Sequence, residues 1–345
     1  MSEPRSDHES IYFHSDQESG LQAIVAIHST RLGPALGGAR MRPYATKEEA
    51  LWDALRLSRG MTYKAAAAGL ALGGGKAVII GDPAKDKSPE LFRAFGKMVH
   101  GLDGRYITAE DVGTTVEDMS FIRQTTPHVV GMAESEGGSG DPSPVTAIGI
   151  LAAIDACLDF STGKTSLAGK WVAIQGVGKV GMALAKLLYN RAAYLVVCDV
   201  MPERALLAKR QFDAKVVQPE DFFGLKVDIL APCSLGGVLN DETIARIQAP
   251  IIAGAANNQL LDEERHGRML TERGIIYAPD YVANAGGLIS VYGEIERTGR
   301  ELALERTRRI GETVYRILEI ARDEKIPTHQ AANRLAEARL TEARK

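Results

Sequence analysis

Cysteine is scarce in this sequence: only Cys157, Cys198 and Cys233 occur among 345 residues, and they lie far apart. An odd number of widely spaced cysteines forms neither a disulfide framework nor the paired-cysteine pattern of a zinc site. We therefore expect a chain without structural disulfides and without a bound metal, and we expect it in the cytoplasm.

Long apolar runs and an excess of positive charge are also missing. The longest apolar stretch, residues 65–75, is interrupted by glycine and ends at Lys76, short of the ~18 residues that a membrane span requires. The first ten residues are polar and lack the apolar core of a signal peptide. With 41 basic and 44 acidic residues the net charge is −3, which does not indicate a nucleic-acid binder. Neither a membrane nor a nucleic acid is an expected partner.

Glycine, by contrast, is abundant. The chain has 35 glycines, against roughly 24 expected at the average frequency of about 7%. Because glycine is entropically costly in helices and strands, the surplus predicts places where the backbone turns tightly or approaches another group closely. The length itself predicts about two domains, each able to bury a substantial core.

The first part of the chain mixes strands and helices. Short apolar segments at 23–28 and 77–80 predict buried strands. Thr46 predicts the start of a helix, and Glu49 three residues later completes the pattern of a capping box. The glycine-, serine- and proline-rich segment 134–144 is the best candidate for a linker.

Beyond residue 144 the pattern changes to a regular alternation of strands and helices. A helix is expected at 145–158, and two more close the chain at 301–321 and 328–343. The strands expected between them are 171–175, 195–198, 229–231 and 251–253. Such alternation is typical of a parallel sheet with right-handed crossovers, so the predicted fold class is α/β.

The strand expected at 171–175 leads directly into a glycine-rich turn, and a helix follows. The turn contains the pattern G-x-G-x-x-G, formed by Gly176, Gly178 and Gly181, and the next strand ends at Asp199. A strand, a glycine turn, a helix and a following acid make up the dinucleotide-binding fingerprint. It assigns to a dinucleotide cofactor the residues Gly176, Val177, Gly178, Lys179, Val180, Gly181 and Asp199.

Each part of this fingerprint has a physical role. The first glycine makes the turn, the second lets pyrophosphate approach the backbone, and the third lets helix and strand pack closely. The helix N-terminus offers free N–H groups to the phosphates. Asp199 would bind the ribose hydroxyls and repel a 2′-phosphate, which favours NAD over NADP, although Arg204 weakens that preference. A glycine turn without a ligand remains the alternative.

Two lysines, Lys64 and Lys76, are candidate reactive groups in the first half of the chain. Lys76 follows three glycines, but Leu70 and Ala77 break the phosphate-binding loop pattern G-x-x-x-x-G-K-[ST], which excludes that kind of site. Both lysines lie among small and apolar residues, where burial and a neighbouring cation lower a lysine pKa and suit it to acid–base catalysis. From the residues alone, two surface lysines at loop ends remain the alternative.

Several segments match the motifs of a known family in that family's order. They are 37–41 (GGARM), 55–64 (LRLSRGMTYK), 73–76 (GGGK), 108–113 (TAEDVG), 141–146 (DPSPVT), 176–181 (GVGKVG), 231–237 (APCSLGG), 254–259 (GAANNQ) and 277–287 (YAPDYVANAGG). They extend over nearly the whole chain. The sequence resembles the amino-acid dehydrogenases that act on leucine, valine, phenylalanine and tryptophan, the shorter branch of the glutamate dehydrogenase superfamily.

The resemblance implies a reversible oxidative deamination, in which an L-amino acid, NAD and water give a 2-oxo acid, NADH and ammonium. It assigns Lys64 to binding the substrate α-carboxylate, Lys76 to activating water and polarising the developing carbonyl, and Asp111 to exchanging protons with the amino group. It also implies a homo-oligomer. Residues 1–142, rejoined by 322–345, would form an α/β substrate and oligomerisation domain, and residues 143–321 a Rossmann-type NAD-binding domain.

The remaining site residues rest on the same resemblance. Besides Lys64, the substrate is expected to contact Leu36, Gly37, Gly38, Met61, Ala109, Asn258, Leu288 and Val291. The cofactor is further expected to contact Thr146, Cys233, Asn257 and Asn284, with Cys233 beside it and not a nucleophile. A simple turn remains the alternative for Gly37–Gly38 and for the adjacent asparagines, and an ordinary core position for Met61.

The apolar positions matched to the side-chain pocket predict an apolar substrate. Ala109 and Leu288 narrow the pocket, which favours leucine or valine. Phenylalanine and tryptophan stay open, because pockets that differ by a methylene or two discriminate by only ~1–3 kcal/mol.

Two rival functions make different demands on the sequence. A 2-hydroxy-acid dehydrogenase would need a histidine–acid pair, and none of the seven histidines forms such a motif beside a glycine loop. A catalytically silent NAD-binding protein would be expected to lose Lys64, Lys76 or Asp111, and all three are present. The glycines of the matched motifs are expected to lie close to ligands, so that alanine replacements damage binding more than folding.

Overall fold

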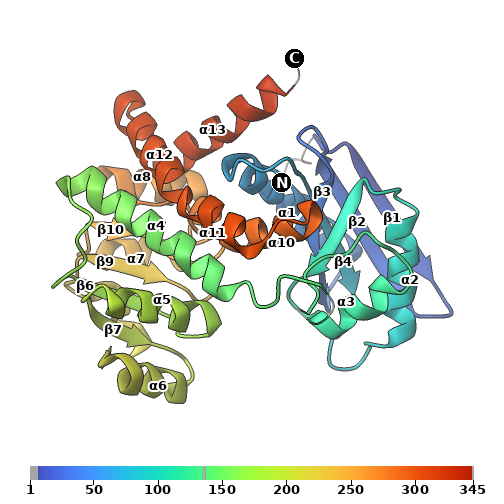
Figure 1. The fold of residues 1–345 in the computed structure, drawn as a ribbon, viewed down its shortest axis with the longest axis horizontal. Coiled ribbons are helices and arrows are strands. Elements are labelled where there is room, and N and C mark those ends of the chain that lie inside the picture. The colour runs from blue at the N-terminus through green and yellow to red at the C-terminus, as the bar shows by residue number, and fades with distance from the viewer. Residues whose placement is uncertain (1–6, 134, 136, 344–345) are drawn as a thin grey trace. The chain divides into compact units, whose positions relative to one another are not determined.

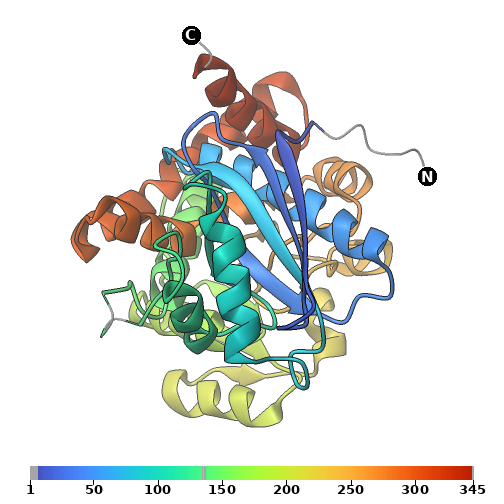
Figure 2. The same cartoon turned by 90° about the vertical axis from the view of Figure 1, so that its right-hand side faces the viewer.

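The computed structural model describes residues 7–133, 135 and 137–343 (Figure 1, Figure 2). These residues form two compact units. Unit 1 comprises the described residues within 1–140, 291–298 and 336–345, and unit 2 those within 141–290 and 299–335. The boundary after Gly140 falls inside the predicted linker, of which Glu134 and Glu136 lie outside the described residues.

Unit 1 is built on a mixed sheet of five strands in the order β1-β2-β4-β3-β5. The strands are β1 (Ser10–Asp16), β2 (Leu21–Ser29), β3 (Ala35–Arg42), β4 (Gly73–Ile80) and β5 (Tyr106–Glu110). β2 pairs antiparallel with β1 and β4, whereas β3 pairs parallel with β4 and β5. The strands expected at 23–28 and 77–80 are confirmed. β4 begins earlier than expected, so the three glycines before Lys76 lie within the strand.

Helices cover both faces of this sheet. They are α1 (Lys47–Ala67), α2 (Pro89–His100) and α3 (Val116–Arg123). Ile24 of β2 and Val78 of β4 pack in one apolar cluster with α1, whereas Val25 and Ile79 pack in another cluster with α2 and α3. Side chains alternate across a strand, so neighbouring residues serve opposite faces. Figure 2 shows α2, in teal, in front of the sheet and α1, in blue, behind it.

α1 begins at the residue that the sequence predicts. The Thr46 side chain accepts the backbone N–H of Glu49 at 3.1 Å. The second half of the expected capping box differs, because the Glu49 carboxylate accepts the N–H of Ala45 at 3.0 Å instead of that of Thr46. α1 then continues to Ala67, which places Lys64 in a helix and not at a loop end.

Unit 2 contains a parallel sheet of six strands. They are β6 (Trp171–Gln175), β7 (Tyr194–Cys198), β8 (Lys215–Val216), β9 (Ile229–Pro232), β10 (Ile251–Ile252) and β11 (Ile276–Tyr277). In their order, β11-β10-β9-β6-β7-β8, the first strand, β6, lies between β7 and β8 on one side and β9, β10 and β11 on the other, so the strand order reverses at β6. This is the strand order of the Rossmann dinucleotide-binding fold, and it confirms the predicted fold class.

The other helices begin in unit 2. They are α4 (Ser143–Thr162), α5 (Lys179–Asn190), α6 (Pro202–Phe212), α7 (Asp241–Arg246), α8 (Glu263–Glu272), α9 (Asp280–Ala283), α10 (Gly286–Glu296), α11 (Arg300–Arg308), α12 (Ile310–Glu324) and α13 (Thr328–Glu342), with a 3₁₀ turn at Pro219–Gly224. α10 and α13 end in unit 1. The single helix expected at 301–321 is wrong, because Arg309 separates α11 from α12.

Among the described residues one helix, α4, is long and apolar enough to cross a membrane by length and composition, with a mean hydropathy of 1.6. Many of its apolar residues, Ile150 and Ile154 among them, are buried within unit 2. α4 packs against α5, α11 and α12. These contacts are those of a core helix.

Candidate functional site

Two of the predicted catalytic residues meet in unit 1. Lys76 lies in β4 and Asp111 directly follows β5, the two strands that flank β3. The Lys76 ammonium forms an ion pair with Oδ2 of Asp111. The Lys76 side chain is 7% exposed and that of Asp111 is 19% exposed, so the pair is largely withdrawn from water. The parallel arrangement of β4, β3 and β5 brings together residues that are far apart in the sequence.

The surroundings of this pair change the pKa of both groups. Burial is the largest influence on Lys76 and, together with the nearby Arg40 cation, it outweighs the attraction of Asp111, so the pKa of Lys76 is lowered. Burial alone would raise the pKa of Asp111, but the Lys76 and Arg40 cations outweigh it and lower this pKa. A lysine that loses its proton more easily than usual, beside a carboxylate that stays ionised, is suited to proton transfer near neutral pH.

Arg40 and Asp53 extend the pair into a row of four alternating charges. Arg40 Nε donates to Oδ2 of Asp111 at 3.2 Å, and Arg40 Nη1 donates to Oδ2 of Asp53 at 3.1 Å. The same Asp53 oxygen accepts the Tyr44 hydroxyl at 2.8 Å. The sequence motif contains Arg40 without indicating its partners, which come from a different strand end and from α1. Asp53 is easier than Arg40 to notice in the sequence as a candidate site residue, because it is a charged residue among the apolar positions of α1.

Lys64 lies in the last turn of α1, and α1 is held very close to β4. A side chain at Gly74 would place its Cβ only 2.1 Å from the backbone nitrogen of Thr62, so this approach requires glycine. Lys76 lies two residues beyond Gly74 and therefore on the same, α1-facing side of β4. Lys64 lies two residues beyond Thr62 in the helix and is half-buried. Lys64 and Lys76 therefore lie on a helix and a strand that pack against each other at Gly74.

Other predicted substrate residues of unit 1 are Leu36, Gly37, Gly38, Met61, Ala109 and Val291. Gly37 and Gly38 lie inside β3 and not in a turn. A Cβ on Gly38 would lie 2.6 Å from the Glu110 carbonyl oxygen and 2.8 Å from Cβ of Asp111, so this glycine lets β3 lie close to the chain segment that carries Asp111. Met61 is half-buried in α1. Asn258 and Leu288 belong to unit 2.

The glycine turn of unit 2 has the geometry that the dinucleotide fingerprint requires. Gly176 follows β6 with φ of +87°, a left-handed conformation that favours glycine. A Cβ on Gly178 would meet nothing closer than an Arg204 guanidinium nitrogen at 4.0 Å, so this side of the turn is open. A Cβ on Gly181 would lie 2.0 Å from the Gly176 carbonyl oxygen, so the third glycine permits close packing. α5 begins at Lys179 without a side-chain cap, which leaves its first N–H groups available to an anion.

Asp199 lies against this turn. It follows β7, and its Oδ2 accepts the backbone N–H of Val177 at 2.8 Å, while its Oδ1 accepts that of Met201 at 2.9 Å. The parallel pairing of β6 with β7 therefore brings the acid to the glycine turn, as the fingerprint predicts.

Further predicted cofactor residues also lie in unit 2. Asn284 donates to the Asn257 side-chain oxygen at 2.7 Å and to the Ala255 carbonyl at 3.0 Å. The Asn284 Oδ1 is buried and has no hydrogen-bond partner among the described residues. A buried acceptor without a donor costs ~1–3 kcal/mol, so this atom fits a ligand that carries hydroxyl or amide donors. Thr146 lies close to Gly287, because a Cβ added to this glycine would be 3.2 Å from Thr146 Oγ1.

Cys233 is half-buried in the loop after β9. Burial raises the pKa of its thiol to about 12. A thiol with such a pKa carries almost no thiolate at neutral pH, which agrees with a residue that is not a nucleophile.

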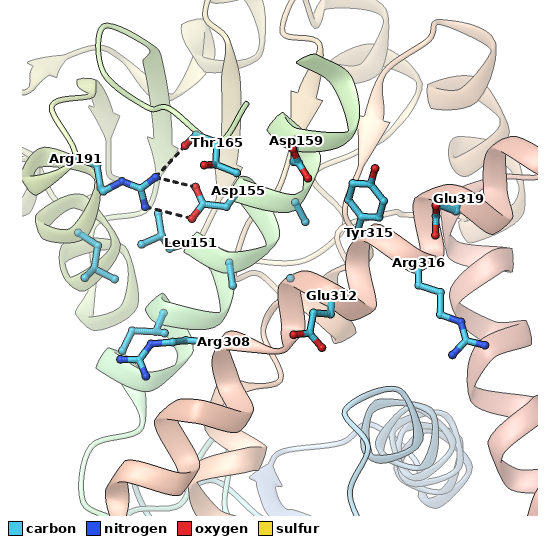
Figure 3. Close-up of a pocket in the computed structure, with 15 residues that line it drawn as sticks. Leu151, Asp155, Asp159, Thr165, Arg191, Arg308, Glu312, Tyr315, Arg316 and Glu319 are labelled. Carbon is cyan, nitrogen blue, oxygen red and sulfur yellow. Dashed lines mark hydrogen bonds and ion pairs between the residues drawn. The ribbon is translucent and has the colours of Figure 1, made fainter. Parts of the chain in front are cut away.

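A large cavity of unit 2 is separate from the glycine turn. It has a volume of about 910 Å³ and is lined by residues of α4, α5 and α12, including Leu151, Leu187 and Tyr315 (Figure 3). Arg191, which pairs with Asp155 at its edge, directly follows the last residue of α5. The glycine turn lies at the first residue of α5, about 18 Å away along a helix of this length. Dinucleotides bind at the carboxyl ends of the strands, so this cavity is not the cofactor site.

A dinucleotide-type glycine turn and a buried lysine–carboxylate pair, each on its own α/β unit, define a dehydrogenase that acts on a small molecule. Two family models match the chain, "Glu/Leu/Phe/Val dehydrogenase, dimerisation domain" over residues 8–128 and "Glutamate/Leucine/Phenylalanine/Valine dehydrogenase" over residues 202–345.

Individual relatives extend over almost the whole chain. A leucine dehydrogenase of Thermoactinomyces intermedius is 53% identical over 98% of this chain and 92% of its own length. A phenylalanine dehydrogenase of Caldalkalibacillus thermarum is 47% identical over 97% and 92%. The crystal structure of L-tryptophan dehydrogenase from Nostoc punctiforme superposes with a TM-score of 0.88 at 45% identity, over 99% of this chain and 98% of that one. The chain belongs to the Glu/Leu/Phe/Val dehydrogenase family, and it is a dinucleotide-dependent amino-acid dehydrogenase.

Proposed function

We propose that this chain catalyses the reversible, NAD-dependent oxidative deamination of an L-amino acid with an apolar side chain, with leucine or valine preferred. The buried Lys76–Asp111 pair carries this proposal. Converting an amine-bearing carbon into a carbonyl requires several proton transfers besides the removal of hydride, and the pair provides an acid and a base in contact.

The predicted roles of the three residues follow from their chemistry. Lys64 binds the α-carboxylate through its charge. Lys76 in its neutral form accepts a proton from the attacking water, and in its charged form it polarises the carbonyl oxygen. Asp111 exchanges protons with the amino group and the departing ammonia. NAD, when bound, supplies the hydride acceptor.

The preference for NAD over NADP rests on Asp199. Its carboxylate lies beside the glycine turn, where it would accept the ribose hydroxyls and repel a 2′-phosphate. Arg204, whose guanidinium lies near the open side of Gly178, acts in the opposite direction. We expect a lower KM for NAD than for NADP. In an Asp199→Ser variant the two KM values should become more similar.

The proposed preference for leucine or valine rests on the identity of the chain to known enzymes and on the volume of the side chains expected to line the pocket. Leucine dehydrogenases are 52–53% identical to this chain, while the matching phenylalanine and tryptophan dehydrogenases are 47–48% identical. Ala109 is half-buried in β5 and Leu288 is buried in α10. If both line the side-chain pocket, as the family resemblance implies, they would narrow the space for an aromatic substrate. An aromatic L-amino acid is the second candidate.

A homo-oligomer is the proposed assembly. The matched dimerisation domain covers residues 8–128, and β1 is an edge strand of the unit 1 sheet. Phe13 on β1 is 63% exposed, so this edge offers a large apolar side chain to a second copy of the chain. Light scattering should show a mass above that of one chain, and Phe13→Glu should lower it.

The deciding experiment measures NADH absorbance at alkaline pH with a panel of L-amino acids. We expect turnover with leucine and valine, and weaker turnover with phenylalanine or tryptophan. Lys76→Ala should lower kcat by about three orders of magnitude, as loss of a general acid–base group does, while the dissociation constant for NAD stays unchanged. A folded protein that binds NAD but oxidises no amino acid would contradict the proposal and favour a silent NAD-binding protein.

A further inference from the structure

The Asp111 carboxylate is held by two cations on the same oxygen. Both the Lys76 ammonium and Arg40 Nε contact Oδ2. Arg40 lies in β3, between the strand that carries Lys76 and the strand that precedes Asp111. Its side chain is 18% exposed, so the contact is made mostly out of water. Arg40 therefore holds the same carboxylate oxygen as Lys76, but from the neighbouring strand.

Arg40 is itself held from its other side. Its Nη1 donates to Asp53 Oδ2 at 3.1 Å, and the same oxygen accepts the Tyr44 hydroxyl at 2.8 Å. The other Asp53 oxygen, Oδ1, accepts Arg56 Nη2 at 3.1 Å. Asp53 is anchored on α1, the helix that also carries Lys64. The row Lys76, Asp111, Arg40 and Asp53 thus connects the sheet to α1 through charges of alternating sign.

We propose that Arg40, held in place by Asp53, is a positioning residue that sets the orientation of Asp111 and the charge environment of the Lys76–Asp111 pair. This inference rests on the proposed roles of Lys76 and Asp111. Arg40 acts through these residues and does not itself contact the amino acid. Asp53 is the second positioning residue, because it fixes the Arg40 guanidinium and balances its charge.

Stability alone is a weak explanation for this arrangement. Buried ion pairs are often no more stabilising than well-packed apolar residues of similar size, because removing the charges from water is costly. A cation next to the Lys76–Asp111 pair does, however, alter its chemistry, since it repels the protonated lysine and attracts the ionised carboxylate.

The charges around Lys76 determine the direction in which each variant should shift the pKa of this lysine. They are Asp111, which follows β5, Arg40 from β3, and Asp53 from α1, the helix that also carries Lys64. Arg40 lowers the pKa of Lys76, and Asp53 raises it. Removing the Arg40 charge should therefore raise the pKa of Lys76, and removing the Asp53 charge should lower it.

The test compares the pH dependence of kcat for amino-acid oxidation in the full-length protein. Because the reaction needs neutral Lys76, activity should rise with pH through the pKa of this group. Arg40→Gln should shift the rise to higher pH, and Asp53→Asn should shift it to lower pH, each by about half a unit or more, in line with the effect of a neighbouring charge. Arg40→Gln should also lower kcat about tenfold or more with little change in KM, and Arg40→Lys should recover part of kcat.

Arg42→Gln is the matched control, because Arg42 lies on the same strand but pairs with Glu49 at the surface. It should leave the pH profile unchanged. Shifts of Arg40→Gln and Asp53→Asn in the same direction, or no shift in either, would overturn the proposal. If Arg40→Gln does not fold, Asp53→Asn still decides, since an unshifted pH profile in Asp53→Asn contradicts the proposal. Failure of the proposed function is separate, because then the unmodified protein oxidises no amino acid.

Discussion

Glycines in the matched motifs have two different physical roles. Gly74 lies where α1 meets β4, and a Cβ there would come within 2.1 Å of the Thr62 backbone nitrogen and 2.6 Å of the Ser58 carbonyl. Gly178, by contrast, borders open space at the start of α5. The expectation that alanine at such glycines damages binding more than folding is therefore wrong for Gly74, whereas it suits Gly178.

Gly74→Ala should destabilise the fold, because the new methyl group meets backbone atoms that cannot move independently. We expect a decrease of about 3 kcal/mol or more in the free energy of unfolding, at the upper end of overpacking effects. Gly60→Ala is the control, since Gly60 lies in α1 with no atom near its missing side chain, and alanine favours a helix. Denaturant unfolding measures both variants, and equal stabilities would contradict the packing argument.

Gly178→Ala should weaken dinucleotide binding with little effect on stability. The methyl group would occupy the side of the turn that pyrophosphate approaches. We expect the dissociation constant for NAD to rise at least about tenfold, measured by fluorescence titration, with an unchanged melting temperature. Gly181→Ala provides the contrast, because its Cβ would collide with the Gly176 carbonyl and lower the melting temperature. An unaffected NAD affinity in Gly178→Ala would place the pyrophosphate elsewhere.

At the scale of elements, two buried histidines join the start of the chain to α1. His8 Nε2 contacts Ser58 Oγ at 2.9 Å, and His28 Nδ1 on β2 contacts Thr62 Oγ1 at 2.9 Å. Burial is the largest influence on both rings and lowers the pKa of each below the usual 6.5. The rings are therefore neutral in the folded protein at a pH where the unfolded chain already binds protons.

This difference makes stability depend on pH. Stability from the neutral rings is complete above pH 6.5 and is lost as pH falls through the lowered pKa values of the folded state. The melting temperature of the unmodified protein should therefore drop between pH 7.5 and 5.5, and His28→Gln should reduce that drop. His14→Gln, a change at an exposed site on β1, should not. An identical pH dependence in all three proteins would argue against the histidines.

Local sequence patterns predicted the elements whose signals are local. Apolar runs located β2, β4 and β6, and capping residues located the start of α1. β3 was missed because its sequence, ALGGARMR, shows neither an apolar run nor a regular alternation. The break between α11 and α12 has no proline signal. Next to it, Gly311 lies so close to α4 that a Cβ would be 3.0 Å from the Ala152 carbonyl, a contact that only the folded protein reveals.

The candidate catalytic site shows the same limit of prediction from local sequence patterns. Lys76, Asp111 and the glycine turn are identified by motifs, because each motif carries chemistry within a few residues. The partners of Arg40 are not, because they depend on the order of β4, β3 and β5 and on the face of α1 that packs on them.

At the scale of the whole molecule, the end of the chain completes the helix that carries Lys64. Arg339 of α13 donates to the Ala66 carbonyl at 2.9 Å and to the Leu70 carbonyl at 3.1 Å, at the end of α1. Glu337 accepts the Tyr63 hydroxyl at 2.9 Å. The last described turns of α13 thus belong to unit 1, although the helix begins in unit 2.

Arg339→Ala should loosen the end of α1, because it removes the guanidinium donor from the Leu70 carbonyl and from the Ala66 carbonyl, of which Ala66 keeps only backbone donors. We expect a loss of ~1–3 kcal/mol in unfolding free energy and a several-fold higher KM for the amino acid, with an unchanged affinity for NAD. Arg334→Ala is the control, since Arg334 lies on the same helix and pairs with Glu324 at the surface. A KM unaffected by Arg339→Ala would separate α13 from the amino-acid site.

The return of α13 to unit 1 bears on how this protein can be cut, tagged or shortened. A fragment that stops at Gly140 would include all five strands of the first sheet, yet it would lack the arginine that binds the end of α1. A protease that cleaves just after Leu335 would leave the Rossmann strands uncut while releasing that arginine. Damage to the carboxyl terminus should therefore be detected first as poor use of the amino acid, before any loss of NAD binding.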